Sequence, residues 1–208
     1  MARKEKDFYL FLEFFKKGIV LKKRVEWIVS KCIKREVLDV GCVGKSGIIH
    51  SKIAKVAKEC VGIDIDVEKV KMMRRLGYNV IVADAENFSL NRKFDVIVAG
   101  ELIEHLSNPG LFLDCVRKHL KKTGYLVLTT PNARALRIFL NKPFTSEHVQ
   151  LYNLRALTNL LQRHGFQVTS IQFFWSDAKN LLGKLYDQLF VRFFPGFAVW
   201  FGVTARPS

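Results

Sequence analysis

The stretch VLDVGCVGKSG, from Val37 to Gly47, decides how the rest of the chain is interpreted. It begins as an apolar run and ends in a loop that contains Gly41, Gly44 and Gly47. In open α/β sheets, ligands bind at the carboxyl ends of the parallel strands, often against a loop of this kind. The first question is therefore which ligand this loop can hold.

Two nucleotide-binding loops match the stretch incompletely. A phosphate-binding P-loop requires glycine five positions before its Gly-Lys pair, and that position holds Asp39, whose carboxylate would repel a phosphate. A dinucleotide loop requires glycine at the third position of its fingerprint, where this sequence has Val43. The acidic residue expected about 20 positions later is present as Asp64, but a carboxylate there serves any cofactor that carries an adenosine. The residues thus disfavour a P-loop and indicate an adenosine-bearing cofactor.

Outside this loop, short apolar runs alternate with amphipathic segments. The runs are EVLDVG, CVGIDI, YNVIVA, FDVIVAG and GYLVLTT, at residues 36–41, 60–65, 78–83, 94–100 and 124–130. The segments 51–59, 67–77 and 108–122 have helical spacing. After Thr130, the pattern predicts helices at 154–166 and 177–194 and strands at 166–174 and 197–206, and residues 1–35 are typical of one or two basic amphipathic helices. Strands that are apolar on both faces and alternate with helices indicate a parallel, doubly wound sheet.

The composition suits a globular domain with an excess of positive charge. Hydrophobic residues make up 49% of the 208 positions and charged residues 25%, and the formal net charge of +15 favours anionic partners. The four cysteines form no CxxC pair, so we expect reduced thiols in a cytoplasmic protein. We expect no signal peptide and no transmembrane segment, because the uncharged stretch 193–205 is too short to cross a bilayer.

Several motifs, in order and spacing, resemble the class I S-adenosylmethionine-dependent methyltransferases, and most closely the group of ubiquinone-biosynthesis-type O-methyltransferases. These motifs lie between about Glu36 and Ile171, and they are VLDVGCVGKSG, VGIDID, VIVADAENF, FDVIVAGELIEHL, GYLVLTTPN and HGFQV. The resemblance implies a Rossmann-like α/β fold: a doubly wound, seven-stranded sheet, mostly parallel with an antiparallel last strand, and helices on both faces. We predict one domain over 1–208, with a helical cap (1–35), a cofactor-binding half (36–132) and a substrate-side half (133–208).

The resemblance also implies the cofactor, S-adenosylmethionine, with S-adenosylhomocysteine as its product. The residues it assigns to cofactor binding are Asp39, Gly41, Cys42, Val43, Gly44, Asp64, Ile65, Asp84, Ala85, Glu86, Gly100 and Glu101. In this assignment Asp64 takes the ribose hydroxyls, Ile65 packs on the adenine, and Asp84 meets the adenine edge. Val43 departs from the family pattern, which has glycine there, and this puts the local path of the backbone in question.

Some acidic residues also have structural explanations. Asp39 lies inside an otherwise apolar strand and therefore needs a buried partner. Asp66 precedes Val67 and the helical segment after it, which predicts a helix N-cap. Asp84 could equally cap a turn, and Cys42 fits a small packing residue better than a nucleophile.

The segment GELIEHL places Glu101, Glu104 and His105 at positions i, i+3 and i+4, which would share one face of a helix. Three roles remain open for this face: a structural helix start, general-base catalysis by His105, or a divalent-metal site. His148, in the loop after TTPN, is the candidate for a second acid/base or a further ligand. We predict catalytic roles for His105, His148 and Glu104, with a metal allowed but not required.

The acceptor is the least determined part of the prediction. We expect a methyl transferase acting on an oxygen, or less favourably a nitrogen, of a small molecule; the alternatives are an RNA methyltransferase and a cofactor-binding protein without catalysis. The aromatic-rich segment 185–202 would suit a lipophilic acceptor or peripheral membrane contact, although its aromatics also suit a core. The sequence leaves the oligomeric state undetermined.

Overall fold

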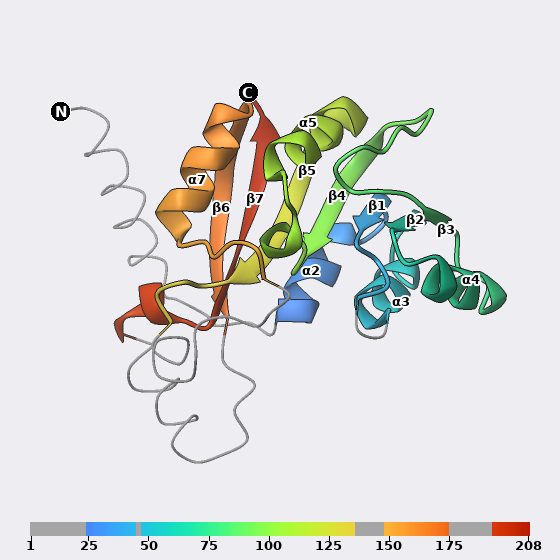
Figure 1. The fold of residues 1–208 in the computed structure, drawn as a ribbon, viewed down its shortest axis with the longest axis horizontal. Coiled ribbons are helices and arrows are strands. Elements are labelled where there is room, and N and C mark those ends of the chain that lie inside the picture. The colour runs from blue at the N-terminus through green and yellow to red at the C-terminus, as the bar shows by residue number, and fades with distance from the viewer. Residues whose placement is uncertain (1–23, 45–46, 136–147, 175–192) are drawn as a thin grey trace, which may run out of the picture.

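A seven-stranded sheet runs through the part of the chain that the computed structural model describes, residues 24–44, 47–135, 148–174 and 193–208 (Figure 1). Its strand order is β3-β2-β1-β4-β5-β7-β6, and β7 runs antiparallel to both of its neighbours while the other pairs are parallel. The strands are β1 (Glu36–Val40), β2 (Glu59–Asp64), β3 (Val80–Val82), β4 (Phe94–Gly100), β5 (Leu120–Pro131), β6 (Phe166–Phe174) and β7 (Trp200–Pro207). The predicted fold class, including the antiparallel last strand, is confirmed.

Helices cover both faces of this sheet. The α-helices are α2 (Arg24–Cys32), α3 (Ile48–Ala54), α4 (Val67–Arg75), α5 (Pro109–His119) and α7 (Leu154–Arg163), and two short 3-10 helices are η1 (Ile103–His105) and η3 (Pro195–Phe197). Successive side chains of a strand point to opposite faces. Accordingly, Ile97 and Ala99 of β4 belong to the core under α5 and α7, whereas Val96 and Val98 belong to the core under α2 and α3.

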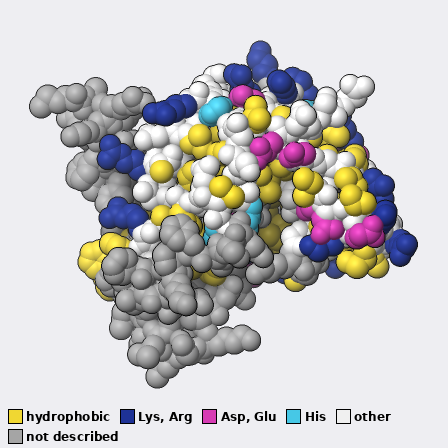
Figure 2. All heavy atoms as spheres, viewed as in Figure 1, with side chains coloured by type: hydrophobic (Ala, Val, Ile, Leu, Met, Phe, Trp, Pro, Cys, Tyr) yellow, Lys and Arg dark blue, Asp and Glu magenta, His cyan; other side chains and the backbone are white. Residues whose placement is uncertain are grey.

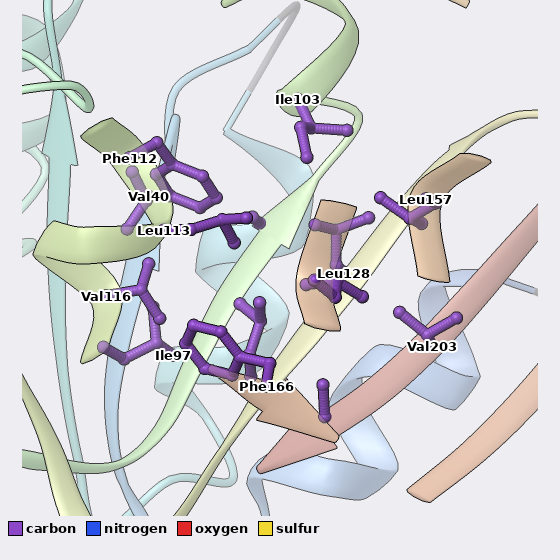
Figure 3. Close-up of a cluster of buried hydrophobic side chains, with 14 of the residues drawn as sticks. Val40, Ile97, Ile103, Phe112, Leu113, Val116, Leu128, Leu157, Phe166 and Val203 are labelled. Atoms are coloured by element: carbon purple, nitrogen blue, oxygen red, sulfur yellow. The ribbon is translucent and has the colours of Figure 1, made fainter. Parts of the chain in front are cut away.

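The larger of the two cores fixes α5 and α7 against the strands. Figure 3 shows side chains from α5 next to those from neighbouring strands, and they lie close to Ile103, the first residue of η1. The labelled residues are Val40, Ile97, Ile103, Phe112, Leu113, Val116, Leu128, Leu157, Phe166 and Val203. Because η1 is anchored in this core, the residues next to Ile103 are held at a defined position beyond the carboxyl end of β4.

Two predicted helices have different bounds in the structure. The helix predicted at 51–59 begins earlier, at Ile48, and ends at Ala54, so that Glu59 already pairs in β2. The helix predicted at 108–122 ends at His119, because Leu120 is buried and pairs with Phe94 as the start of β5. In both places strand pairing in the sheet outweighs local helical spacing. The predicted helix at 177–194 and residues 1–23 of the predicted cap lie mainly or wholly outside the described residues.

The surface view agrees with a positive charge that is spread rather than gathered at one site. Figure 2 shows Lys and Arg side chains mainly around the periphery of this face. Within the described ranges, no helix has both the length and the apolar character that crossing a bilayer requires. All four cysteines are free, and three of them are buried.

Candidate functional site

The glycine loop, residues 41–44, turns away from β1 at the carboxyl edge of the sheet. Gly41 has a φ of 72°, and a Cβ atom there would lie 3.0 Å from Cδ1 of Leu102. A side chain is therefore excluded by both conformation and space. The N–H groups of Gly41 and Cys42 donate to the carbonyl oxygen of Ile63, at 2.9 and 3.1 Å, which holds the loop against β2.

Val43 occupies the loop position at which the related families have glycine. Its side chain is 2% exposed and packs with Val70, Met73 and Val80, together with Cys42. Its N–H group donates to Oδ2 of Asp64 at 3.0 Å. A valine is compatible with this loop because the side chain enters the core while the main chain turns toward Asp64.

The ends of β2 and β3 lie beside this loop. The carbonyl oxygen of Asp64 accepts from Ala83 N at 3.0 Å, and Ile65 is 68% exposed at the edge of the sheet. Oδ1 of Asp84 accepts from Glu86 N at 2.8 Å, so Asp84 does cap a turn. The structure thus joins the segments that carry the residues predicted to meet the ribose and adenine, and it leaves the side chain of Ile65 exposed at this edge.

Asp39 has the buried partner that its position in β1 required. Its carboxylate is 3% exposed, and Oδ2 lies 3.1 Å from Nδ1 of His50, which α3 places at 0% exposure. Asp66 also behaves as predicted, because its side chain accepts from Lys69 N at the start of α4.

Glu101 does not share a helical face with Glu104 and His105, and this part of the prediction is wrong. Glu101 has a φ of 57°, outside helical conformation, and η1 begins only at Ile103. Its Oε1 instead lies 3.2 Å from Nη1 of Arg24, whose guanidinium stacks over the ring of Trp200. The left-handed conformation of Glu101 interrupts the helix that the spacing predicted.

Glu104, His105 and His148 form a compact polar cluster, called the Glu-His-His cluster below. One potential ligand atom from each residue lies within 4.8 Å of the others, and the two imidazole rings meet edge to face with centroids 4.9 Å apart. Glu104 is 1% exposed, and its Oε2 accepts from the hydroxyl of Thr130 at 3.0 Å. Its Oε1 is buried and has no hydrogen-bond partner among the described residues. A buried oxygen of this kind is costly unless a ligand or water satisfies it.

The main chain explains how His148 reaches η1. The carbonyl oxygen of Glu104 accepts hydrogen bonds from Val149 N at 2.8 Å and Gln150 N at 3.1 Å. A little further along, Tyr152 forms a bridge with Asn132 at the end of β5. The segment that carries His148 is therefore fastened at two places beside the carboxyl ends of β4 and β5.

Burial sets the electrostatics of the cluster. Desolvation and, second, the negative charge of Glu101 raise the pKa of Glu104 to about 8. Desolvation and the charge of Glu104 raise the pKa of Tyr152 to about 12. A carboxyl group that holds its proton near neutral pH, next to two imidazoles, can exchange a proton with a bound hydroxyl group. The same three donors are also chemically suitable for a divalent ion.

Several residues of this region were not found from the sequence. Arg24, His50, Thr130 and Tyr152 come from four distant segments, and only tertiary contacts bring them to the site. The sequence did contain one signal. Asp39 is an acid in an apolar strand, which predicts a buried partner, but nothing in the sequence identified that partner as His50.

Known proteins resemble this chain in sequence and in fold. A family model described as a methyltransferase domain matches residues 6–171. The chain is 31% identical over 124 residues to the mitochondrial ubiquinone biosynthesis O-methyltransferase of Rattus norvegicus, a match that covers 54% of this chain and 35% of the rat protein. This chain spans about a third to about half of the length of the curated relatives it matches.

Two solved structures have the same fold at low sequence identity. One is an S-adenosylmethionine-dependent methyltransferase from Clostridium acetobutylicum, with a TM-score of 0.65 at 13% identity over 99% of both chains. The other is the magnesium protoporphyrin IX methyltransferase of Synechocystis with bound S-adenosylhomocysteine, with a TM-score of 0.62 at 15% identity over 88% of this chain and 80% of that one.

Proposed function

Because this chain belongs to the class I S-adenosylmethionine-dependent methyltransferases, we propose that it transfers a methyl group from this cofactor to an oxygen atom of a small molecule. The observation that carries the proposal is the position of the Glu-His-His cluster. Leu102, which lies against Gly41 of the glycine loop, is only two residues from Glu104. The cluster is therefore only two residues along the chain from a side chain that packs on the loop expected to bind the cofactor.

The described residues fit the cofactor at both of its ends. Gly41 has a positive φ and lets the loop pack closely on Leu102, which gives the main chain the tight turn that the cofactor loop needs. Asp64 presents a carboxylate for the vicinal ribose hydroxyls, and the exposed Ile65 beside it offers an apolar surface for the adenine. Asp39 supplies negative charge behind the loop for the cationic methionine end.

The Glu-His-His cluster fits an acceptor hydroxyl group. An oxygen placed among three atoms that are at most 4.8 Å apart can lie within about 2.8 Å of each, which is hydrogen-bond distance. In this position the hydroxyl proton passes to an imidazole of His105 or His148, which becomes an imidazolium, and the neighbouring Glu104 carboxyl group orients the pair. S-adenosylmethionine supplies the methyl group, whose bond to sulfur breaks as the bond to the acceptor oxygen forms.

Two further considerations favour oxygen in a small molecule. Enzymes that methylate exocyclic amines of DNA bases carry an Asn-Pro-Pro-aromatic motif after the fourth strand, where this chain has AGELIEH. One relative is named as an O-methyltransferase of ubiquinone biosynthesis. The net charge of +15 suits an anionic acceptor, and it would also suit RNA, which is the second candidate.

A labelling experiment tests the proposal. The purified protein is incubated with methyl-labelled S-adenosylmethionine and separate pools of phenols and other hydroxylated metabolites, hydroxylated lipids, amines, and RNA. We expect label in a hydroxylated small molecule, on an oxygen by fragment-ion mass spectrometry, and none with the His105→Ala/His148→Ala variant. Label confined to amines or RNA would refute the acceptor class. An absence of transfer together with an absence of S-adenosylhomocysteine binding would refute the activity itself.

A further inference from the structure

The second polar cluster of the molecule lies behind the glycine loop rather than in front of it. His50 is fully buried in α3, and its Nδ1 is 3.1 Å from Oδ2 of Asp39 and 3.7 Å from Sγ of Cys60. The ring packs edge to face against Tyr78, with centroids 5.5 Å apart. The main chain of β2 makes room for this ring, because a Cβ atom on Gly62 would lie 2.8 Å from Cε1 of His50.

The hydrogen bonding of this ring indicates which nitrogen donates. A carboxylate only accepts, so Nδ1 carries the proton that it shares with Asp39. Nε2 is buried without a hydrogen-bond partner in the described part of the chain. His50 therefore faces the Asp39 carboxylate with its donor nitrogen.

We propose that His50 is a positioning residue for the cofactor: its Nδ1–H keeps the buried Asp39 carboxylate ionised and oriented toward the ammonium group of the methionine end. His50 engages Oδ2 of this carboxylate and so fixes its orientation. Asp39 is two residues before Gly41, so a rotation of its side chain would misplace the charge relative to the loop. This inference goes beyond the methyl acceptor and depends only on the cofactor.

The surroundings of Asp39 show why it needs this donor. Burial is the largest influence and raises the pKa of Asp39, and the nearby carboxylate of Asp64 raises it further. The hydrogen bond and the charge interaction with His50 act in the opposite direction. When the donor is removed, the Asp39 carboxyl group takes up a proton at a higher pH, and its attraction for an ammonium group is lost.

Other titratable groups also lie near the pair. Three thiols face it, those of Cys32 from α2, Cys42 from the loop and Cys60 from β2, and burial raises the pKa of each. Tyr78 covers the ring from the segment before β3. Asp64, at the end of β2, adds a negative charge. A pH dependence of affinity that the His50→Leu variant shows and an Asp39→Asn variant lacks therefore reports Asp39.

The test measures the affinity for S-adenosylhomocysteine by calorimetry between about pH 6 and about pH 9. His50→Asn places its amide N–H near the position of Nδ1 and retains the donor, whereas His50→Leu removes it. We expect the Asn variant to follow the unchanged protein. We expect the Leu variant to bind about tenfold or more weakly than the unchanged protein at the acidic end and to approach its affinity at the alkaline end, because loss of the donor raises the pKa of Asp39.

Two additions keep the result decisive. His50→Gln, whose amide reaches the Nε2 position away from Asp39, replaces the Leu variant if that protein does not give a cooperative thermal transition. Asp39→Asn should bind weakly at every pH. Equal affinity loss for all His50 variants at every pH, or no loss, would show that His50 only packs and would overturn the proposal. The experiment measures cofactor binding without a methyl acceptor. A result that refutes the role of His50 therefore leaves the proposed O-methylation untouched, and the reverse also holds.

Discussion

The imidazole rings of His105 and His148 lie edge to face, 4.9 Å apart, although one follows β4 and the other lies beyond β5. The contact depends on the main chain, because the carbonyl oxygen of Glu104 accepts the N–H groups that follow His148. Two residues that the sequence offered as separate acid/base candidates therefore form one unit. Residues that act as a unit give strongly non-additive effects when they are substituted.

Substitution of either histidine should reduce turnover without loss of cofactor. We expect His105→Ala to lower turnover by roughly 10²–10⁴-fold, the usual contribution of a general base, and the double variant with His148→Ala to be little worse. Steady-state kinetics and S-adenosylhomocysteine calorimetry measure the two effects. His164→Ala is the matched control, since His164 pairs with Asp114 away from this cluster, and its turnover should not change. Full activity in both single variants would make the cluster structural.

Glu104→Gln should change how stability depends on pH. The folded pKa of Glu104 is about 8, above the usual value of 4.5, so the folded state holds a proton that the unfolded state releases. Stability is then highest below about pH 4.5 and falls as pH rises toward about 8. At about 1.4 kcal/mol per pKa unit the loss is on the order of a few kcal/mol. Denaturant unfolding at several pH values measures the free energy of unfolding, which should fall less with rising pH in the Gln variant than in the unchanged protein. The same dependence on pH in both proteins would contradict the prediction.

Asp64→Ala should weaken cofactor binding by about 1.5–3 kcal/mol, the usual value for hydrogen bonds to a charged group. The Asp64 carboxylate also accepts from Val43 N and Asp66 N, at 3.0 Å each, so its loss loosens the loop as well. Asp64→Asn retains an acceptor oxygen for one of these bonds and should lose less. Calorimetry with S-adenosylhomocysteine gives both values. Unchanged affinity in the Ala variant would mean that the adenosine binds elsewhere.

Chelation separates the two chemical roles of the Glu-His-His cluster. If the imidazoles act as the base, turnover should survive dialysis against EDTA and should not rise with added Mn²⁺, Fe²⁺ or Zn²⁺. Activity that disappears on chelation and returns with one of these ions would instead identify a metal site, because one carboxylate and two imidazoles suit divalent transition metals. The His105→Ala protein is assayed in parallel with and without added ion, and its turnover shows how much activity remains when the cluster lacks one imidazole.

Gly62→Ala should destabilise the protein by about 1–3 kcal/mol, the range for overpacking in a core. A Cβ atom there would lie 2.6 Å from Sγ of Cys42 and 2.8 Å from Cε1 of His50, two side chains that are themselves buried. Gly196→Ala is the control, since a Cβ atom at Gly196 would meet nothing within 4 Å. Thermal unfolding of both variants tests the difference, and a Gly62 variant as stable as the control would show that this packing can relax.

The sequence by itself determined the architecture of this protein. Alternating apolar runs and amphipathic segments specify a doubly wound sheet, because period and length of apolar patterns are local properties. Local chemistry also predicted the N-cap at Asp66 and offered a turn at Asp84 as an alternative to cofactor binding, and the hydrogen bonds of both close within three residues. The apolar residues on both sides of Asp39 were enough to predict that its carboxylate needs a buried partner.

Only the tertiary structure decided which side chains meet. The partner of Asp39 is His50, and the partner of Glu101 is Arg24, because sheet order and helix packing bring α3 and α2 to those positions. Helical spacing wrongly grouped Glu101 with Glu104, since a left-handed residue after β4 breaks the helix. Spacing along a chain records neighbours within one element, whereas contacts between elements depend on how their apolar faces pack, and the site is made of such contacts.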